Sequence, residues 1–241
     1  MTAASDYLAK AVSLLQVASR REAATITAAA AVASDRVAEG GLIYIFGTGH
    51  SHMMAEEGHF RAGGLACVVP VLSSAVMLHE GAMASTQLER LTGLAEIVLS
   101  RYPIGPADVL IVFSTSGVNA APVEAARFGR ARGATVIAVT SVAYSTAAAH
   151  GRERLADLGD FVLDTGAPPG DAIATIRDGV TAGPVSTVLG AALLNALLVE
   201  VAVDLERKGH AAPVYLSANM PGAAENNAKL TEIYKARNPH L

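Results

Sequence analysis

The chain contains 241 residues, of which 51% are hydrophobic and 17% are charged, and its formal net charge at pH 7 is −4. A chain of this composition can bury a large core, which excludes an intrinsically disordered protein. The negative charge and the lack of any dense run of Lys and Arg argue against a nucleic-acid-binding surface, so we expect no nucleic-acid partner.

The single cysteine and the hydropathy pattern indicate the cellular compartment of the protein. Cys67 cannot form an intramolecular disulfide, lies in an apolar run that predicts burial, and suits a reducing compartment. The most apolar stretch, residues 185–203, carries four polar or charged residues and does not reach the ~18 uninterrupted apolar residues of a membrane span. Asp6 and Lys10 among alanines do not form a secretory signal, so we expect a cytoplasmic protein with no membrane partner.

Hydrophobic periodicity predicts an alternation of helices and strands. Residues 3–39 lack Pro and Gly and favour one long helix or two abutting helices, whereas residues 73–87 are mixed and give no clear element. We predict strands at 42–46, 65–71, 108–113, 135–140 and 161–163, and further helices at 51–62, 93–101, 121–132, 185–208 and 224–237. Such alternation is typical of an α/β fold with a parallel sheet covered on both faces.

We expect the whole chain, residues 1–241, to form one domain. The predicted organisation is a helical N-terminal extension at about 3–39, an α/β core at about 40–208, and a C-terminal helical tail at about 209–241. No solenoid-type repeat or low-complexity tract divides it.

Two short polar loops, each preceded by an apolar strand, carry the functional signal. The first is Gly47-Thr48-Gly49-His50-Ser51, and the second is Ser114-Thr115-Ser116-Gly117. Glycines let the backbone approach a ligand closely, and hydroxyls and loop N–H groups donate hydrogen bonds near the positive end of a following helix. Because ligands bind at the carboxyl ends of parallel strands, both loops are suited to hold an anion such as phosphate.

Two common phosphate motifs are excluded. The first loop begins G-x-G, but His52 stands at the third glycine position of a dinucleotide fingerprint, and the next strand ends without the acidic residue that would bind a ribose. Neither loop has the G-x-x-x-x-G-K-[ST] pattern of a P-loop.

The G-x-G-x-S turn after the first strand, together with the S-x-S-G turn after a later one, resembles the sugar isomerase (SIS) domain family over about residues 5–207. The resemblance implies a flavodoxin-like three-layer sandwich, a phosphosugar ligand and a homodimer or tetramer. The single domain and long first helix are most similar to the sedoheptulose-7-phosphate isomerase branch. The tail at 216–227 is outside that branch's pattern and resembles a different subgroup of SIS proteins.

The resemblance implies a set of phosphosugar-binding residues in the two loops. The family's phosphate-binding hydroxyls correspond to Ser51, Ser114, Thr115 and Ser116, and Asn119 stands where Ser or Thr is usual. An Asn amide can still donate a hydrogen bond. The predicted binding residues are Gly47, Thr48, Gly49, His50, Ser51, Ser114, Thr115, Ser116, Gly117 and Asn119.

An aldose–ketose isomerase needs a carboxylate that moves a proton between C1 and C2, and a group that opens the sugar ring. The related isomerases carry a Glu on the helix after the first loop, at the position where Arg61 falls here. We predict Glu57 as the base, because a base should stand close to the bound phosphosugar, and Glu80 as the alternative. The ring-opening residue stays open, since the family's His on the last long helix is absent. The histidine candidates are His50, His52, His79 and His210, with His52 and His79 grouped with the two carboxylates as catalytic candidates.

We expect no cofactor and no metal site. His52, Glu56 and His59 share one helix face at a spacing that could bind zinc if another ligand joined them, but we favour a polar pocket or a subunit contact as their role. In the tail, His210, Ser217, Asn219 and Asn227 are candidates for a segment that folds over the pocket.

The sequence therefore predicts a sugar-phosphate isomerase that works through an enediol with a Glu base. Two alternatives remain: a phosphosugar sensor without activity, and a lyase or deaminase acting on amino-sugar phosphates. A sensor is normally fused to a DNA-binding or other effector domain, and no basic helix-turn-helix segment precedes the sheet here, so we favour the isomerase.

Overall fold

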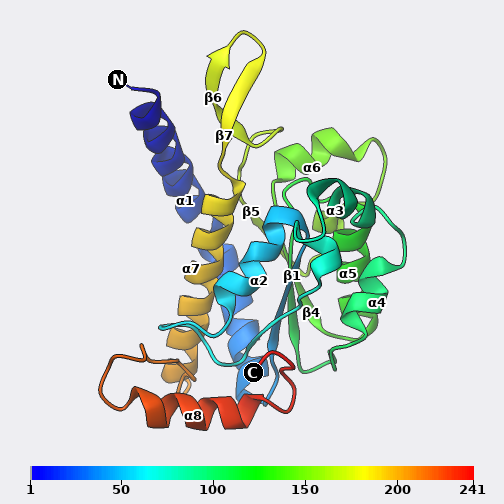
Figure 1. Ribbon diagram of the computed structural model, residues 1–241. Helices are drawn as coiled ribbons and strands as arrows, with labels where there is room; N and C mark the ends of the chain where they lie inside the picture. Colours follow the sequence, from blue (N-terminus) through cyan, green and yellow to red (C-terminus); the bar gives the residue numbers. More distant parts are fainter. Residues whose placement is uncertain (1) are drawn as a thin grey trace.

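A five-stranded parallel sheet forms the centre of the protein (Figure 1). The computed structural model describes residues 2–241. The strand order is β2-β1-β3-β4-β5, which is the flavodoxin-like order of a doubly wound sheet. The strands are β1 (Ile43–Gly47), β2 (Val68–Pro70), β3 (Val109–Phe113), β4 (Thr135–Thr140) and β5 (Phe161–Asp164).

The strands read as near-continuous apolar runs because both faces of the sheet are covered by helices. Every residue of β1 and β3 is buried. Cys67, just before β2, is also buried, and burial raises the pKa of its thiol to about 12, so the sulfur is a core group. The predicted α/β class and parallel sheet are confirmed.

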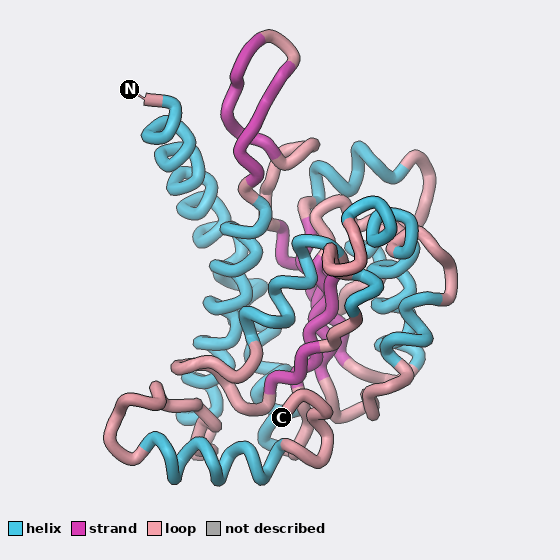
Figure 2. Tube along the Cα trace, in the orientation of Figure 1, coloured by secondary structure: helices cyan, strands magenta, loops and turns pink. Residues whose placement is uncertain are grey.

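Helices form one layer on each side of the sheet, which confirms the three-layer sandwich (Figure 2). On one side, α2 packs on β1 and β2, while α1 packs on β5 and against α7; on the other side, α5 packs on β3 and β4, with α4 against it. The first layer is α1 (Ala3–Ala38), α2 (Met53–Gly58) and α7 (Ser186–Arg207); the second is α4 (Leu94–Leu99) and α5 (Ala120–Ala131).

The N-terminal helix is one unbroken element that begins at the Thr2 cap, whose hydroxyl accepts a hydrogen bond from the Ser5 N–H. Its buried positions include Ala29, Ala30 and Ala33, and these small side chains let the helix approach α7 closely. Its C-terminal half is therefore part of the core, whereas its first turns extend past the sheet (Figure 1).

A β-hairpin that the sequence does not predict projects beside these first turns (Figure 1). It consists of β6 (Ala172–Arg177) and β7 (Val180–Pro184). Most of its residues are exposed, so it has no buried face to produce a hydrophobic alternation in the sequence. The Tyr7 hydroxyl donates to the Pro184 carbonyl at 2.8 Å, and the Lys10 ammonium donates to the Ile173 carbonyl at 3.2 Å, which fixes the hairpin to α1.

Local details differ from the sequence expectations. The helix predicted at 51–62 is a 3-10 turn (Gly49–His52) followed by α2, which ends at Gly58 before Phe60 adopts φ +43°. The second strand is shorter than predicted. Two helices form where the sequence gives no element: α3 (Ala82–Leu88) and α6 (Val142–Ala149).

The C-terminal tail packs at the opposite end of the sheet from the two polar loops. Helix α8 (Ala223–Tyr234) crosses below the sheet in Figure 1. The Arg237 guanidinium then donates to both oxygens of the buried Asp108 carboxylate, at 2.8 and 2.7 Å. The tail of this chain therefore lies away from the loops and does not fold over them.

Helix α7 is long and apolar enough, by length and composition alone, to cross a membrane. Its position in the fold accounts for this composition, because one side is packed against α1 and α2 in the core. The other side leaves Val188, Val199 and Val203 exposed, by 42%, 61% and 46%.

Candidate functional site

The two polar loops meet at the carboxyl ends of adjacent strands. The register of β1 and β3 pairs Gly47 with Phe113, so the loops begin at the same level of the sheet. They border a cavity of about 420 Å³, which continues into a recess of about 20 Å³. The cavity is lined by Thr48, Gly49, His50, Ser51, Glu89, Arg90, Ser114, Thr115, Ser116, Asn119, Tyr144, Asp171, Pro184, Ser186 and Thr187.

The first loop depends on a close backbone approach. A Cβ at Gly47 would lie 2.3 Å from the Ser51 carbonyl oxygen, so only glycine permits this turn. The turn directs His50 and Ser51 to the cavity, and His50 is exposed there. Thr48 is buried, and its hydroxyl donates to the Glu89 carboxylate at 2.8 Å.

The second loop also requires its glycine. Gly117 has φ +61°, and a Cβ there would lie 2.8 Å from Thr140 Oγ1. The Gly117 N–H donates to Ser114 Oγ at 3.1 Å. Since this oxygen acts as acceptor within the loop, the Ser114 hydroxyl hydrogen is free to donate into the cavity.

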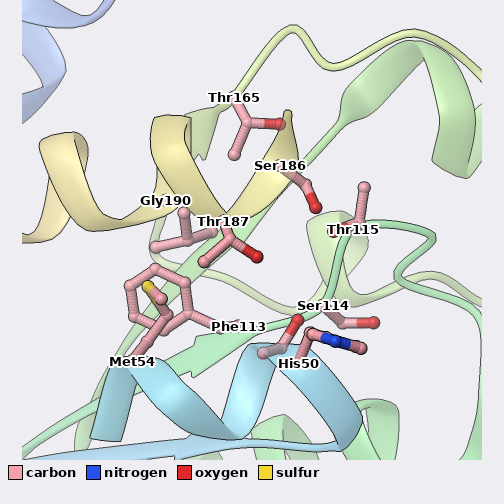
Figure 3. A pocket seen from close by; sticks show the side chains of 11 residues that line it. His50, Met54, Phe113, Ser114, Thr115, Thr165, Ser186, Thr187 and Gly190 are labelled. Atoms are coloured by element: carbon pink, nitrogen blue, oxygen red, sulfur yellow. The ribbon is translucent and has the colours of Figure 1, made fainter. Parts of the chain in front are cut away.

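The start of α7 closes the cavity opposite the loops. Figure 3 shows Ser186 and Thr187 on one side of the recess, with His50 and Ser114 on the other. The Asp171 carboxylate holds this helix start, because it accepts from the Ser186 N–H at 2.7 Å and from the Ser186 hydroxyl at 2.6 Å. Hydroxyl groups from three separate elements therefore point at one enclosed space.

The sequence analysis missed several cavity residues, namely Glu89, Arg90, Tyr144, Asp171, Pro184, Ser186 and Thr187, and Glu89 has the most contacts with the two loops. It follows α3, and its carboxylate accepts from Thr48 in the first loop at 2.8 Å and from the Asn119 amide at the start of α5 at 2.9 Å. Arg90 donates to it at 3.0 Å. No motif marks Glu89; only the fold brings the segment before α4 onto the two loops.

The cavity combines anion-binding groups with two acids. Hydroxyls, loop N–H groups and the starts of the 12-residue α5 and the 22-residue α7 favour an anion, and Arg90 and His50 add cationic or donor groups. Asp171 is engaged by α7, so Glu89 is the carboxylate placed between the anion-binding loops. The arrangement can hold a phosphate and place a carboxylate beside the group attached to it.

The structure places Glu57 outside this cavity. On α2 its carboxylate accepts from Arg61 and, at 2.9 Å, from the Asn195 amide of α7. These residues line a separate hollow of about 130 Å³ between the two helices. The physical reason is the helix phase, since position 57 faces α7 while the loop residues face the sheet end.

The other three catalytic candidates do not line the cavity either. His52 is only 2% exposed, and its Nε2 accepts from the Ser73 N–H at 3.3 Å. His79 and Glu80 are exposed in the segment before α3. Of the four ring-opening candidates, the structure brings His50 alone to the cavity. A catalytic role for Glu57, His52, His79 and Glu80 stays a prediction, which the geometry of a single chain does not favour.

The described residues, 2–241, contain no group of three or more His, Cys, Asp or Glu arranged to hold a metal ion. His52 Nδ1 lies 3.5 Å from a Glu56 carboxylate oxygen, but His59 instead packs near Phe60 and His240. Burial lowers the pKa of both His52 and His59.

A family model described as SIS domain matches residues 6–141. The chain belongs to the SIS domain family. The match includes both polar loops and Glu89, whereas the hairpin, Asp171 and α7 lie beyond it.

The chain is also similar to particular curated proteins and solved structures. It is 56% identical to a UPF0309 protein of Brucella anthropi over 91% of this chain and 88% of that protein, and 54% identical to one of Brucella canis over 93% and 90%. Phosphoheptose isomerases of Neisseria gonorrhoeae and Francisella tularensis share its fold, with TM-scores of 0.55 and 0.56. They are 19% and 14% identical to it, and the alignments cover 83% of this chain in both cases and 97% and 98% of theirs.

The geometry of the second loop gives a testable expectation. Gly117→Ala places a methyl group against Thr140 at a left-handed backbone position, so the loop must shift and anion affinity should fall at least about tenfold. Gly151→Ala is the matched control, because Gly151 has φ +80° with open space around it and lies outside the cavity. Phosphate titration by calorimetry checks both variants. An equal loss of phosphate affinity in the two variants would mean that backbone strain in general, not the contact with Thr140, causes the effect.

Proposed function

We propose that this SIS protein binds a sugar phosphate in the cavity between the two loops and isomerises it between aldose and ketose. The observation that carries the proposal is Glu89, a carboxylate held between two anion-binding loops. A carboxylate there repels a phosphate and costs affinity unless it contacts the sugar. A role in sugar binding or proton transfer accounts for its position.

The phosphate would bind where the hydroxyls of Ser51, Ser114 and Ser116 gather near the start of α5. The sugar would then extend along the cavity towards the start of α7, where Ser186 and Thr187 can hydrogen-bond its hydroxyls. Glu89 lines the same cavity and is the carboxylate that we propose to contact the sugar.

In the proposed reaction, Glu89 takes the proton from C2 of the open-chain aldose and returns it to C1 through an enediol, while a second proton passes from the C2 hydroxyl to the C1 carbonyl oxygen. The Thr48 hydroxyl and the Asn119 amide hold the carboxylate in one orientation. His50 would open the ring by moving the proton of the anomeric hydroxyl to the ring oxygen.

We also propose that residues 1–241 act as one domain and that the protein is cytoplasmic.

The phosphate should dominate ligand affinity. Ser116→Ala removes one charge-assisted hydrogen bond, so binding of a sugar phosphate should weaken by about 1.5–3 kcal/mol in calorimetry. A thermal-shift screen should show stabilisation by sugar phosphates and none by the same sugars without phosphate. Equal affinity for a sugar and its phosphate would reject the binding site.

Glu89→Gln keeps the shape of the side chain and removes the base. Turnover of the sugar phosphate found in the screen should fall about 100-fold or more, while its dissociation constant changes only a few-fold. Glu57→Gln, measured in parallel, separates the two candidates. If Glu57→Gln alone abolishes turnover, the base is Glu57. If the wild-type protein binds but never isomerises, the protein is a sensor.

We further propose a homo-oligomer, a dimer or a tetramer, assembled through helices. The support is the exposed apolar surface on α7 (Val188, Val199, Val203) and on the first turns of α1, where Leu8 and Val12 are 62% and 52% exposed. A helix with apolar side chains on its outer face gains stability when a second copy covers it.

Light scattering of the purified protein at micromolar concentration should give at least twice the mass of one chain. Val199→Glu puts a charge in the proposed contact and should shift the protein towards the monomer, because an unpaired buried charge is costly. Ile97→Glu is the control, since Ile97 is 69% exposed on α4, on the other side of the sheet. A wild-type monomer would contradict the proposal.

A further inference from the structure

The first anion-binding loop is connected to the segment that follows β2. His52, the last residue of the 3-10 turn Gly49–His52, accepts through Nε2 from the Ser73 N–H at 3.3 Å. The preceding amide, the Leu72 N–H, donates to the Tyr102 hydroxyl at 2.9 Å. Two consecutive backbone amides thus join the loop of the cavity to the side chain of Tyr102.

Tyr102 in turn contacts the C-terminus of the chain. Its hydroxyl lies 2.8 Å from His240 Nε2, and its ring is 2% exposed and packs edge-on against Tyr44 at 6.1 Å. The hydroxyl oxygen accepts from Leu72, so its hydrogen is available to His240, which then acts as acceptor in its neutral form. Burial lowers the pKa of His240 and of His52, which favours the neutral form of both rings.

The C-terminal segment has a second anchor close by. Arg237 pairs with Asp108, whose Oδ1 also accepts from the Leu42 N–H at 2.8 Å, just before β1. Residues 237–240 therefore hold both the start of β1 and, through Tyr102, the segment after β2. The first loop follows the carboxyl end of β1 and contacts the segment after β2 through His52, so it is connected to both anchored segments.

We propose that His240 is a positioning residue that sets the first anion-binding loop through Tyr102, the Leu72 and Ser73 amides, and His52. A four-residue 3-10 turn has poor internal hydrogen bonds and depends on outside contacts to keep its shape. Without His240, the Tyr102 hydroxyl loses its acceptor and can turn to the Leu72 carbonyl, 3.5 Å away. The Tyr102 side chain is then no longer held from the C-terminal side, so the segment with the Leu72 and Ser73 amides can shift relative to His52, and His50 and Ser51 lose their alignment.

The test compares variants along this chain of contacts. Tyr102→Phe and His240→Leu remove the contact, whereas His240→Gln keeps an acceptor for the Tyr102 hydroxyl and should rescue it. Lys235→Ala is the control, because Lys235 is exposed and pairs only with Glu232 on the surface. We expect hydrogen exchange of the Ser73 amide to be about tenfold faster in the first two variants and unchanged in the rescue and control variants.

A second, ligand-free readout is the nitrogen chemical shift of the His52 ring. It should move towards the value of an imidazole without a hydrogen-bonded Nε2 in Tyr102→Phe and His240→Leu, while a general loss of stability would leave it in place below the melting temperature. Unchanged Ser73 exchange and an unchanged His52 shift in both variants would overturn the proposal.

Affinity supplies a third readout, which rests on the proposed function. If wild-type protein binds inorganic phosphate or a sugar phosphate, the dissociation constant should rise about fivefold in Tyr102→Phe and His240→Leu. An unchanged affinity would overturn the positioning role. If the wild type binds neither ligand, the proposed function fails, and the Ser73 and His52 measurements decide this inference separately.

Discussion

The parallel pairing of β1 with β3 is the constraint on which the site depends. Its register brings Gly47 level with Phe113, so two loops separated by more than sixty residues start side by side. The strands are buried on both faces, and a slip of the register would move apolar side chains against the wrong helix layer. The rigid sheet thus fixes the distance between the loops, and the glycines in each loop allow the backbone to turn there.

The parts of the fold that the sequence predicts are those with a local cause. Strands buried on both faces produce apolar runs, and the two loops combine glycines with hydroxyls at the strand ends, so both were predictable. Glu89 was not, because its role arises from contacts with Thr48 and Asn119 that only the folded chain creates. The reverse holds for Glu57, which lies near the loop in sequence but faces Arg61 and Asn195 on the far side of α2.

A carboxylate beside an anion site also limits what the ligand can be. The Glu89 carboxylate is held between the loops by hydrogen bonds from Thr48 and Asn119. The carboxylate repels a free phosphate, whereas a phosphorylated sugar also brings hydroxyls that can donate to the carboxylate. The site therefore favours a ligand with both a phosphate and neighbouring hydroxyl groups.

The residues that line the cavity come from two parts of the chain, and we assign them two different roles in ligand binding. The residues suited to phosphate, in the loops at 47–51 and 114–119, lie within the matched SIS segment, while Asp171, Ser186 and Thr187 lie beyond it. The phosphate is common to many sugar phosphates, so the first set cannot distinguish among them. In the proposed binding mode, the choice of sugar depends on the wall that faces the other end of the ligand, which consists of the hairpin base and the start of α7. Asp171 fixes both at once, because its side chain binds the start of α7 and its backbone carbonyl accepts from the Val185 N–H.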